Sequence, residues 1–294
     1  MNLSKELDLA IKAEEAKTID GGYLVGEKEY NTYMTNAEWE RFKGCMLPYA
    51  LDEYGAGGGG ELVEKNGRPP KMACYGSSSR MIYMLSRHKE NFHYEKKLST
   101  TVGGTANLDG FYEDDNRYIF VEAKCHEPYS TKNNSVSKSY EKLYNFINEQ
   151  MAGNVEIAMK TSKCGRYLDV EYFSDGEKLE HFDMKQMICH LLGIATGLLK
   201  GELQQKQIDF IYLLYDPTEL NLATDTKEAV DAIYERTCYE CNLVDFATLL
   251  RVILAFLKEE KYGDVIADEE IDEIIYKLTF SLASQEFYES TILR

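Results

Sequence analysis

The feature that most constrains the fold is a pair of short apolar segments joined by a polar turn. The first segment covers residues 107–112, the second covers residues 118–124, and Asp114-Asp115-Asn116 lies in the turn between them. Two extended segments with such a turn predict a β-hairpin. The second segment is apolar at both odd and even positions until its end, which is typical of a strand covered on both faces. The sequence therefore predicts a central sheet that contains this hairpin.

Two charged residues, Glu122 and Lys124, stand at the end of the second segment. Because side chains alternate along a strand, these two share one face of the sheet. Asp109 on the first segment lies near Glu122 if the two strands are antiparallel neighbours. Two carboxylates directed at one point repel each other, and a divalent cation removes that conflict. Mg²⁺ suits such a pair, with water and phosphate oxygens completing its shell, and Mn²⁺ is an alternative.

Asp109 followed by Glu122-Ala123-Lys124 at the end of an apolar strand resembles the D…ExK signature of the PD-(D/E)XK nuclease superfamily. The resemblance implies an α/β, restriction-endonuclease-like fold with a mixed central sheet flanked by helices. It also implies a Mg²⁺-dependent endonuclease that hydrolyses phosphodiester bonds in DNA. Asp109, Glu122 and the carbonyl of Ala123 would hold the metal. Lys124 would orient or deprotonate the attacking water, or stabilise charge on the phosphate.

A helix is expected to begin after Asp183, and it carries Gln186 and His190 on one face because they are four residues apart. This pair resembles the Q-x-x-x-Y element of RecB-type members of the same superfamily, with His in place of Tyr. The resemblance implies that both side chains lie beside the metal centre. The alternative is two polar residues on the exposed side of a core helix.

Glu95 lies on a predicted strand over residues 91–98, just upstream of the hairpin. In several enzymes of the superfamily an additional upstream acid assists metal binding, and Glu95 is the candidate here. The alternative is a solvated strand residue paired with Lys97. His126 follows the Glu-x-Lys motif closely, but Pro128 ends the strand soon afterwards. We interpret His126 as an ordinary loop residue.

The remaining pattern predicts a single domain over residues 1–294. Its core covers about residues 77–216, with a helical flank over 1–76 and a helical extension over 217–294. The expected elements are helices over 1–20, from Asn36 to Pro48, from Ser77 and over 138–151, a hairpin over 167–182, a strand over 207–215, and helices from Thr226 to the end.

A glycine-rich segment over residues 54–61 precedes a polar stretch over 66–71. A phosphate-binding P-loop requires Gly-Lys-Ser/Thr after the glycines, whereas Glu61 follows here. We interpret the segment either as a flexible loop or as a flap beside the active site, with Arg68 and Lys71 directed at a phosphate backbone. A second basic cluster near the hairpin comprises Lys132, Lys138 and Lys142.

The formal net charge of −17 counts against a protein that binds polyanions nonspecifically. It is compatible with a locally basic surface, and DNA therefore remains the expected partner. The acidity also favours the alternative function, a catalytically inactive PD-(D/E)XK-fold module for binding or assembly. The sequence leaves a monomer and a homo-oligomer equally open.

Seven cysteines scattered along the chain do not predict a disulfide framework. Cys238 and Cys241 form a CxxC pair, but no second pair of ligands stands at a matching spacing. The N-terminus is polar and acidic, unlike a signal peptide, and no apolar run approaches the length of a membrane span. We therefore expect a cytoplasmic protein without membrane contact.

Overall fold

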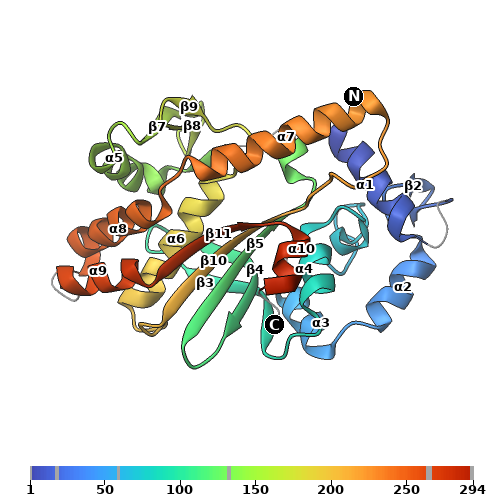
Figure 1. The fold of residues 1–294 in the computed structure, drawn as a ribbon, viewed down its shortest axis with the longest axis horizontal. Coiled ribbons are helices and arrows are strands. Elements are labelled where there is room, and N and C mark those ends of the chain that lie inside the picture. The colour runs from blue at the N-terminus through green and yellow to red at the C-terminus, as the bar shows by residue number, and fades with distance from the viewer. Residues whose placement is uncertain (1, 17–19, 58–59, 131–133, 263–266, 292–294) are drawn as a thin grey trace.

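A mixed five-stranded sheet forms the centre of the computed structural model, which describes residues 2–16, 20–57, 60–130, 134–262 and 267–291 (Figure 1). The strand order is β11-β10-β5-β4-β3. β10 is parallel to both β5 and β11, whereas β4 is antiparallel to both β3 and β5. The strands are β3 (Phe92–Ser99), β4 (Thr105–Glu113), β5 (Arg117–Lys124), β10 (Gln207–Leu214) and β11 (Leu278–Ala283). The predicted α/β class with a central mixed sheet is confirmed.

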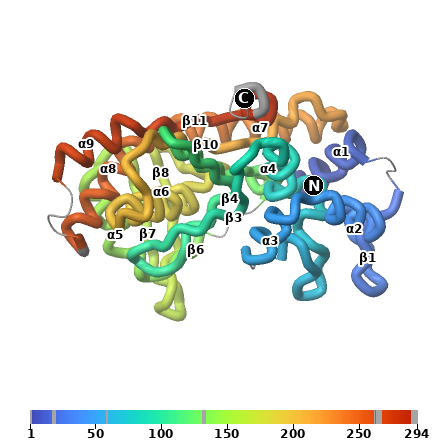
Figure 2. The backbone as a smooth tube through the Cα atoms, turned by 90° about the horizontal axis from the view of Figure 1, so that it is seen from below, coloured from blue at the N-terminus to red at the C-terminus, as the bar shows by residue number. Residues whose placement is uncertain are grey.

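Helices cover both faces of this sheet, as Figure 2 shows from below. The hydrophobic core on one face is shared with α5 (Glu141–Gln150), α6 (Met184–Leu199), α8 (Phe246–Leu257) and α9 (Asp268–Tyr276). The core on the other face is shared with α1 (Leu3–Glu15), α2 (Asn36–Gly44), α3 (Pro48–Gly57), α4 (Ser78–Ser86) and α10 (Gln285–Thr291). The helix α7 (Thr224–Asn242) contacts α1. No helix in these described stretches is long and apolar enough to cross a membrane.

Strand β5 supplies side chains to both hydrophobic cores, as its apolar sequence predicts. Tyr118 and Phe120 face the core that contains α6, whereas Ile119 and Val121 face the core that contains α1 and α4. The even-numbered positions of β5 therefore face α6, and Glu122 and Lys124 continue that series. This places the charged pair directly beneath the helix that carries Gln186 and His190.

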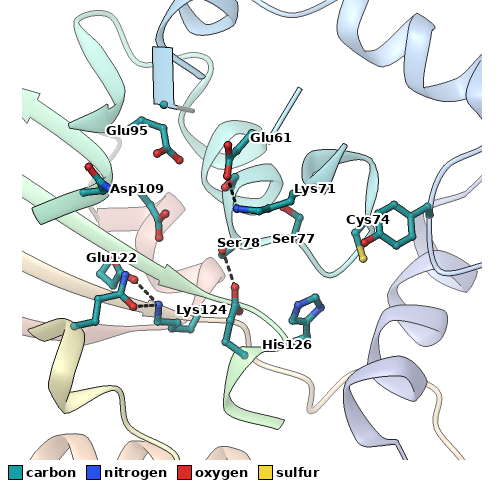
Figure 3. Close-up of a pocket in the computed structure, with 16 residues that line it drawn as sticks. Glu61, Lys71, Cys74, Ser77, Ser78, Glu95, Asp109, Glu122, Lys124 and His126 are labelled. Atoms are coloured by element: carbon teal, nitrogen blue, oxygen red, sulfur yellow. Dashed lines mark hydrogen bonds and ion pairs between the residues drawn. The ribbon is translucent and has the colours of Figure 1, made fainter. Parts of the chain in front are cut away.

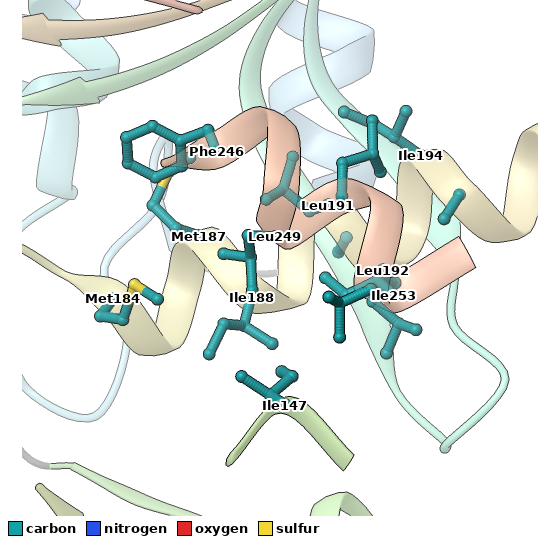
Figure 4. Close-up of a cluster of buried hydrophobic side chains, with 14 of the residues drawn as sticks. Ile147, Met184, Met187, Ile188, Leu191, Leu192, Ile194, Phe246, Leu249 and Ile253 are labelled. Carbon is teal, nitrogen blue, oxygen red and sulfur yellow. The ribbon is translucent and has the colours of Figure 1, made fainter. Parts of the chain in front are cut away.

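Helix α6 is held between the sheet and α8. Its residues Met187, Ile188 and Leu191 pack against Leu249 and Ile253 of α8 (Figure 4). On the sheet side, Gly193 allows close approach, since a Cβ there would lie 2.7 Å from the Cβ of Ala106 on β4. Burial on both sides fixes the position of the helix relative to the strand ends.

A smaller sheet lies beside α5, with the order β6-β8-β7 and with β9 paired to β8. The predicted hairpin over residues 167–182 is observed as β8 (Tyr167–Ser174) and β9 (Glu177–Lys178). The sequence interpretation did not identify β6 (Ser135–Ser137) or β7 (Val155–Thr161), nor the hairpin of β1 (Tyr23–Val25) and β2 (Lys28–Tyr30).

Three expectations about element boundaries need correction. The helix expected from Asn36 does end before Pro48, as α2 at Gly44, but Pro48 then begins a further helix, α3, because proline fits the first turn, where its missing N–H is not needed. The residues from Tyr54 to Gly57 belong to that helix and not to a loop, while Gly58 and Gly59 lie outside the described residues. The C-terminal region is not wholly helical, since β11 joins the central sheet and extends it beyond residue 216.

Candidate functional site

The two strands of the predicted hairpin separate at the end that carries the charged residues. Their last paired residues are Gly110 and Val121. Beyond this point the backbone N–H of Ala123 donates to Asp109 Oδ2 at 2.8 Å. The N–H and C=O of one strand residue point to the same side, so the carbonyl of Ala123 also faces the Asp109 side. The carbonyl of Lys124 points the other way and accepts from Tyr215 N at 2.9 Å.

Strand β3 changes face at Glu95. Tyr94 packs into the core of α4, whereas Leu98 packs into the core of α6, although both positions are even. The change occurs at Glu95, whose backbone has φ +54°, in the left-handed region. A non-glycine residue in that region is uncommon and often marks a functional site.

Strand β4 makes the matching change opposite Glu95. Leu108 and Phe111 both enter the core of α6 although one position is even and the other odd. The register pairs Tyr94 with Gly110 and Lys96 with Leu108, which places Glu95 opposite Asp109. Both acidic side chains therefore leave the regular alternation together and line the same cavity. This is how the fold brings a predicted third acid to the predicted pair.

Gln186 and His190 of α6 each contact one charged residue of β5. Gln186 Oε1 accepts from Lys124 Nζ at 2.6 Å, and His190 Nε2 lies 2.8 Å from Glu122 Oε2. The other oxygen of Glu122 pairs with Lys124 Nζ. Glu122 and His190 are each 1% exposed. Glu122, Lys124 and His190 are buried and Gln186 is half-buried, and the charges of Glu122 and Lys124 are paired with each other.

The two predicted metal-binding acids have opposite electrostatic character. Burial, followed by repulsion from Glu122, raises the pKa of Asp109 well above its usual range. Burial also acts to raise the pKa of Glu122, but Lys124 and His190 hold it below its usual value. Burial acts to lower the pKa of Lys124, but Glu122 raises it well above the usual range. Lys124 is therefore a firmly held ammonium ion next to an ionised Glu122.

Glu61 is a further acid at this site that sequence reasoning missed. It is 5% exposed, and its Oε1 accepts from Lys71 Nζ at 2.8 Å. Its Oε2 has no hydrogen-bond partner among the described residues. Burial and the charge of Glu61 raise the pKa of Glu95 to about 7. The sequence signal for Glu61 was weak, because a single acid after a glycine run is usually solvent-exposed.

These groups surround a polar cavity of about 360 Å³, shown in Figure 3. Asp109, Glu122 and Lys124 lie on the sheet side, with Glu95 above them and Glu61 and Lys71 opposite. Gln186 also lines the cavity, whereas His190 lies behind Glu122. All six predicted catalytic residues thus belong to one connected site.

The predicted basic residues are distributed differently from the expectation. Lys71 lines the cavity, and Arg68 lines a neighbouring cavity that also includes Lys71. Lys138 pairs with Glu141 at 4.0 Å and Lys142 pairs with Glu260 at 2.9 Å, while Lys132 lies outside the described residues. Lys71 and Lys124 are therefore the lysines that line the cavity together with the acids.

Cys241 is buried and Cys238 is half-buried. Within the described ranges, the two belong to no group of three side chains that could hold a metal.

No protein-family model, no curated protein and no solved structure matches this chain.

Proposed function

We propose that the protein is a metal-dependent deoxyribonuclease of the PD-(D/E)XK type, with a restriction-endonuclease-like sheet and Mg²⁺ as the working cation. One observation carries the proposal: Asp109, Glu122 and Lys124 converge at the point where β4 and β5 separate, in a cavity open to a ligand. Two acids can hold a cation and a lysine can stabilise charge on a phosphate, and both tasks serve hydrolysis of a phosphodiester.

The residues fit a hard divalent cation. Asp109 resists ionisation because of burial and Glu122, and a cation between the two acids would relieve that repulsion. The carbonyl of Ala123 faces the same gap and is a suitable third oxygen. The carboxylates of Glu95, Asp109 and Glu122 do not all lie within 4.8 Å of one another. The site therefore suits Mg²⁺ or Mn²⁺, which retain water and use few protein ligands.

The bound cation would neutralise phosphate charge and lower the pKa of a coordinated water. Lys124 is held as an ammonium ion, which favours stabilising charge on the phosphate over accepting a proton. Gln186 fixes Lys124 by accepting one of its hydrogen bonds, and His190 fixes Glu122. These two residues of α6 act as positioning residues. Lys71, across the cavity, is an additional cation for a phosphate group.

The test is a cleavage assay on supercoiled, linear and single-stranded DNA with Mg²⁺ or Mn²⁺. Asp109→Asn removes a metal ligand, and we expect cleavage to disappear. The matched control is Asp115→Asn, the same change in the exposed turn of the same hairpin, and it should leave cleavage unchanged. Lys124→Gln should lower the rate by about 10²- to 10³-fold, the range seen when one charge-stabilising donor is removed.

The alternative function is an inactive module of the same fold, which the net charge of −17 favours. Calorimetric titration with Mg²⁺ and Mn²⁺ separates the two. A nuclease should bind the cation with a signal that Asp109→Asn removes and Asp115→Asn retains. If the unaltered protein binds neither cation and cuts none of the three DNA forms, the nuclease proposal is refuted and the inactive module is favoured.

A further inference from the structure

A second group of potential ligands lies on the other side of the same cavity. Asp8 from α1, Cys74 from the segment before α4, and His126 from just beyond β5 meet there, and Figure 3 shows Cys74 and His126 away from the carboxylates. Asp8 Oδ1 lies 2.8 Å from His126 Nδ1, and Asp8 Oδ2 lies 3.4 Å from Cys74 Sγ. All three ligand atoms lie within 4.8 Å of one another.

The backbone is shaped around this group. At Gly76 an added Cβ would lie 1.7 Å from Asp8 Oδ1 and 3.0 Å from His126 Nδ1, so only glycine permits the observed approach. Asp8 is 6% exposed and Cys74 is 3% exposed. An aspartate on the buried side of a helix is rare unless it is paired or binds a cation.

Burial argues against a thiol nucleophile in this group. The three side chains contact one another, since Asp8 lies against both Cys74 and His126, and Cys74 and His126 also interact directly. Burial is the largest influence on Cys74 and raises the pKa of its thiol, which disfavours the reactive thiolate.

The same arrangement matches a tetrahedral cation site. Zinc ligands at bond lengths of about 2.0 to 2.3 Å are separated from one another by about 3.3 to 3.5 Å. Cys74 Sγ lies 3.4 Å from Asp8 Oδ2, whereas His126 Nδ1 lies 2.8 Å from Asp8 Oδ1. A shift of the Asp8 carboxylate that brings one of its oxygens to about 3.3 to 3.5 Å from both partners would complete the three protein ligands. Sulfur, nitrogen and oxygen together select a borderline-soft metal over Mg²⁺.

We propose that Asp8, Cys74 and His126 bind a divalent transition-metal ion such as Zn²⁺, at a site separate from the carboxylate site. Cys74 and His126 also line the cavity, which leaves water access for the fourth position. His126 follows Lys124 by two residues, and Asp8 belongs to α1. The ion therefore joins the N-terminal helix to the end of the strand that carries Glu122 and Lys124.

Cobalt(II) is the probe, because a thiolate ligand gives Co²⁺ a charge-transfer absorption that oxygen ligands do not produce. The metal-free protein titrated with Co²⁺ should develop this band, and Zn²⁺ should abolish it by displacement. Cys74→Ser should lose the band. Cys125→Ser, a buried neighbouring thiol outside the group, and Cys241→Ser in the CxxC pair should both retain it. Asp109→Asn should also retain it, which separates this result from the outcome of the nuclease proposal.

A band that is absent from the unaltered protein, or that persists in Cys74→Ser, overturns the proposal. Thermal unfolding provides a second measurement, because an ion that binds only the folded state raises the unfolding temperature. Zn²⁺ should raise it for the unaltered protein and for Cys125→Ser, but not for Cys74→Ser, whose hydroxyl can still donate to Asp8. If Cys74→Ser does not fold, His126→Gln replaces it, and an equal rise in that variant contradicts the site.

Discussion

Substituting Glu95 with glutamine should make the metal-free protein more stable at high pH. Burial and the charge of Glu61 raise the pKa of Glu95 from 4.5 to about 7 in the folded state. Between these values the folded protein binds more protons than the unfolded chain does. Stability contributed by protonated Glu95 is therefore present below pH 4.5 and is lost as the pH rises to about 7. Glutamine cannot ionise, so the variant escapes this loss.

The magnitude follows from the size of the shift. A rise from 4.5 to about 7, at about 1.36 kcal/mol per pH unit, corresponds to about 3 kcal/mol of unfolding free energy. Solvent around the partly exposed carboxylate makes this an upper limit. We expect Glu95→Gln to match the unaltered protein at pH 4.5 and to exceed it by about 1 to 3 kcal/mol at pH 8.5.

Urea unfolding at pH 4.5, 6.5 and 8.5 with a chelator present measures this difference. The matched control is Glu113→Gln, the same change at an exposed residue of β4 that pairs with Lys206. It should shift stability little at any pH, because exposed ion pairs contribute little. Equal pH dependence of Glu95→Gln and the unaltered protein would refute the assignment of Glu95 as a buried acid with a raised pKa.

Added Mg²⁺ provides the functional half of the same experiment. At pH 8.5 the cation should restore stability to the unaltered protein, because a ligand that binds only the folded state stabilises it by mass action. The gain should be smaller in Glu95→Gln if Glu95 assists the cation. If Mg²⁺ stabilises both proteins equally, Glu95 does not assist cation binding, and its raised pKa has no role in the metal site.

Three further predictions concern the framework of the site. Gly193→Ala should lower the unfolding free energy by about 1 to 3 kcal/mol, because the added methyl group would push α6 away from the sheet. Its control, Gly55→Ala, lies in a helix with open space around it and should raise the unfolding free energy by roughly 0.5 to 1 kcal/mol in the same denaturation assay. Glu240→Ala removes a buried acceptor of the backbone N–H groups of His181 and Phe182, just before α6. This should lower the unfolding free energy by about 2 kcal/mol or more, also measured by denaturation. His190→Phe removes a group that lowers the pKa of Glu122, so the acidic limb of the pH–rate profile should move to higher pH.

The elements that the sequence predicts correctly are those with a strong local pattern, either a long apolar run or an apolar helical stripe. β5 and β10 read as apolar runs, and they are adjacent parallel strands of the central sheet. Helix α6 combines an N-cap at Asp183 with a long apolar stripe. The cap predicts where the helix begins, and the stripe predicts which of its residues are buried. The phase alone placed Gln186 and His190 on a common face. The distances to Lys124 and Glu122 then follow from packing.

The strand β11 had a signal that was misassigned. Leu278-Thr279-Phe280-Ser281-Leu282 alternates apolar and polar residues, which is typical of a strand. Leu278 also continued an apolar helical stripe from α9, and the helical interpretation was extended through it. The strand is stabilised by contacts far along the chain, including Phe280 stacked on Phe210 and on Phe246. Such contacts cannot be read from a local window.

The acids at the site illustrate a different limit. Strict alternation along a strand puts Glu95 on the same face as Lys97, which corresponds to the alternative in which Glu95 is solvated and paired with Lys97. The observed direction depends on one left-handed backbone angle, φ +54° at Glu95, and on the matching change in β4. Neither has a compositional signature, since glutamate is not a residue that favours this region. The second group of ligands shows the same limit. Asp8 lies 66 positions before Cys74, and Cys74 lies 52 positions before His126, so only the fold brings the three together.

The acidic character of the chain has its counterpart inside the cavity. Five acids line it, namely Glu61, Glu95, Asp109, Glu122 and Glu127, together with Lys71, Lys124 and His126, and each lysine is already paired with one of those acids. Once Glu95 and Asp109 ionise, a phosphate group entering this cavity meets more negative than positive charge unless a cation is present. The cation therefore has two tasks in the proposed reaction, since it must reverse the local charge before it can activate water. A net charge of −17 is then compatible with a DNA substrate, because attraction at the site depends on the bound metal and not on a basic surface.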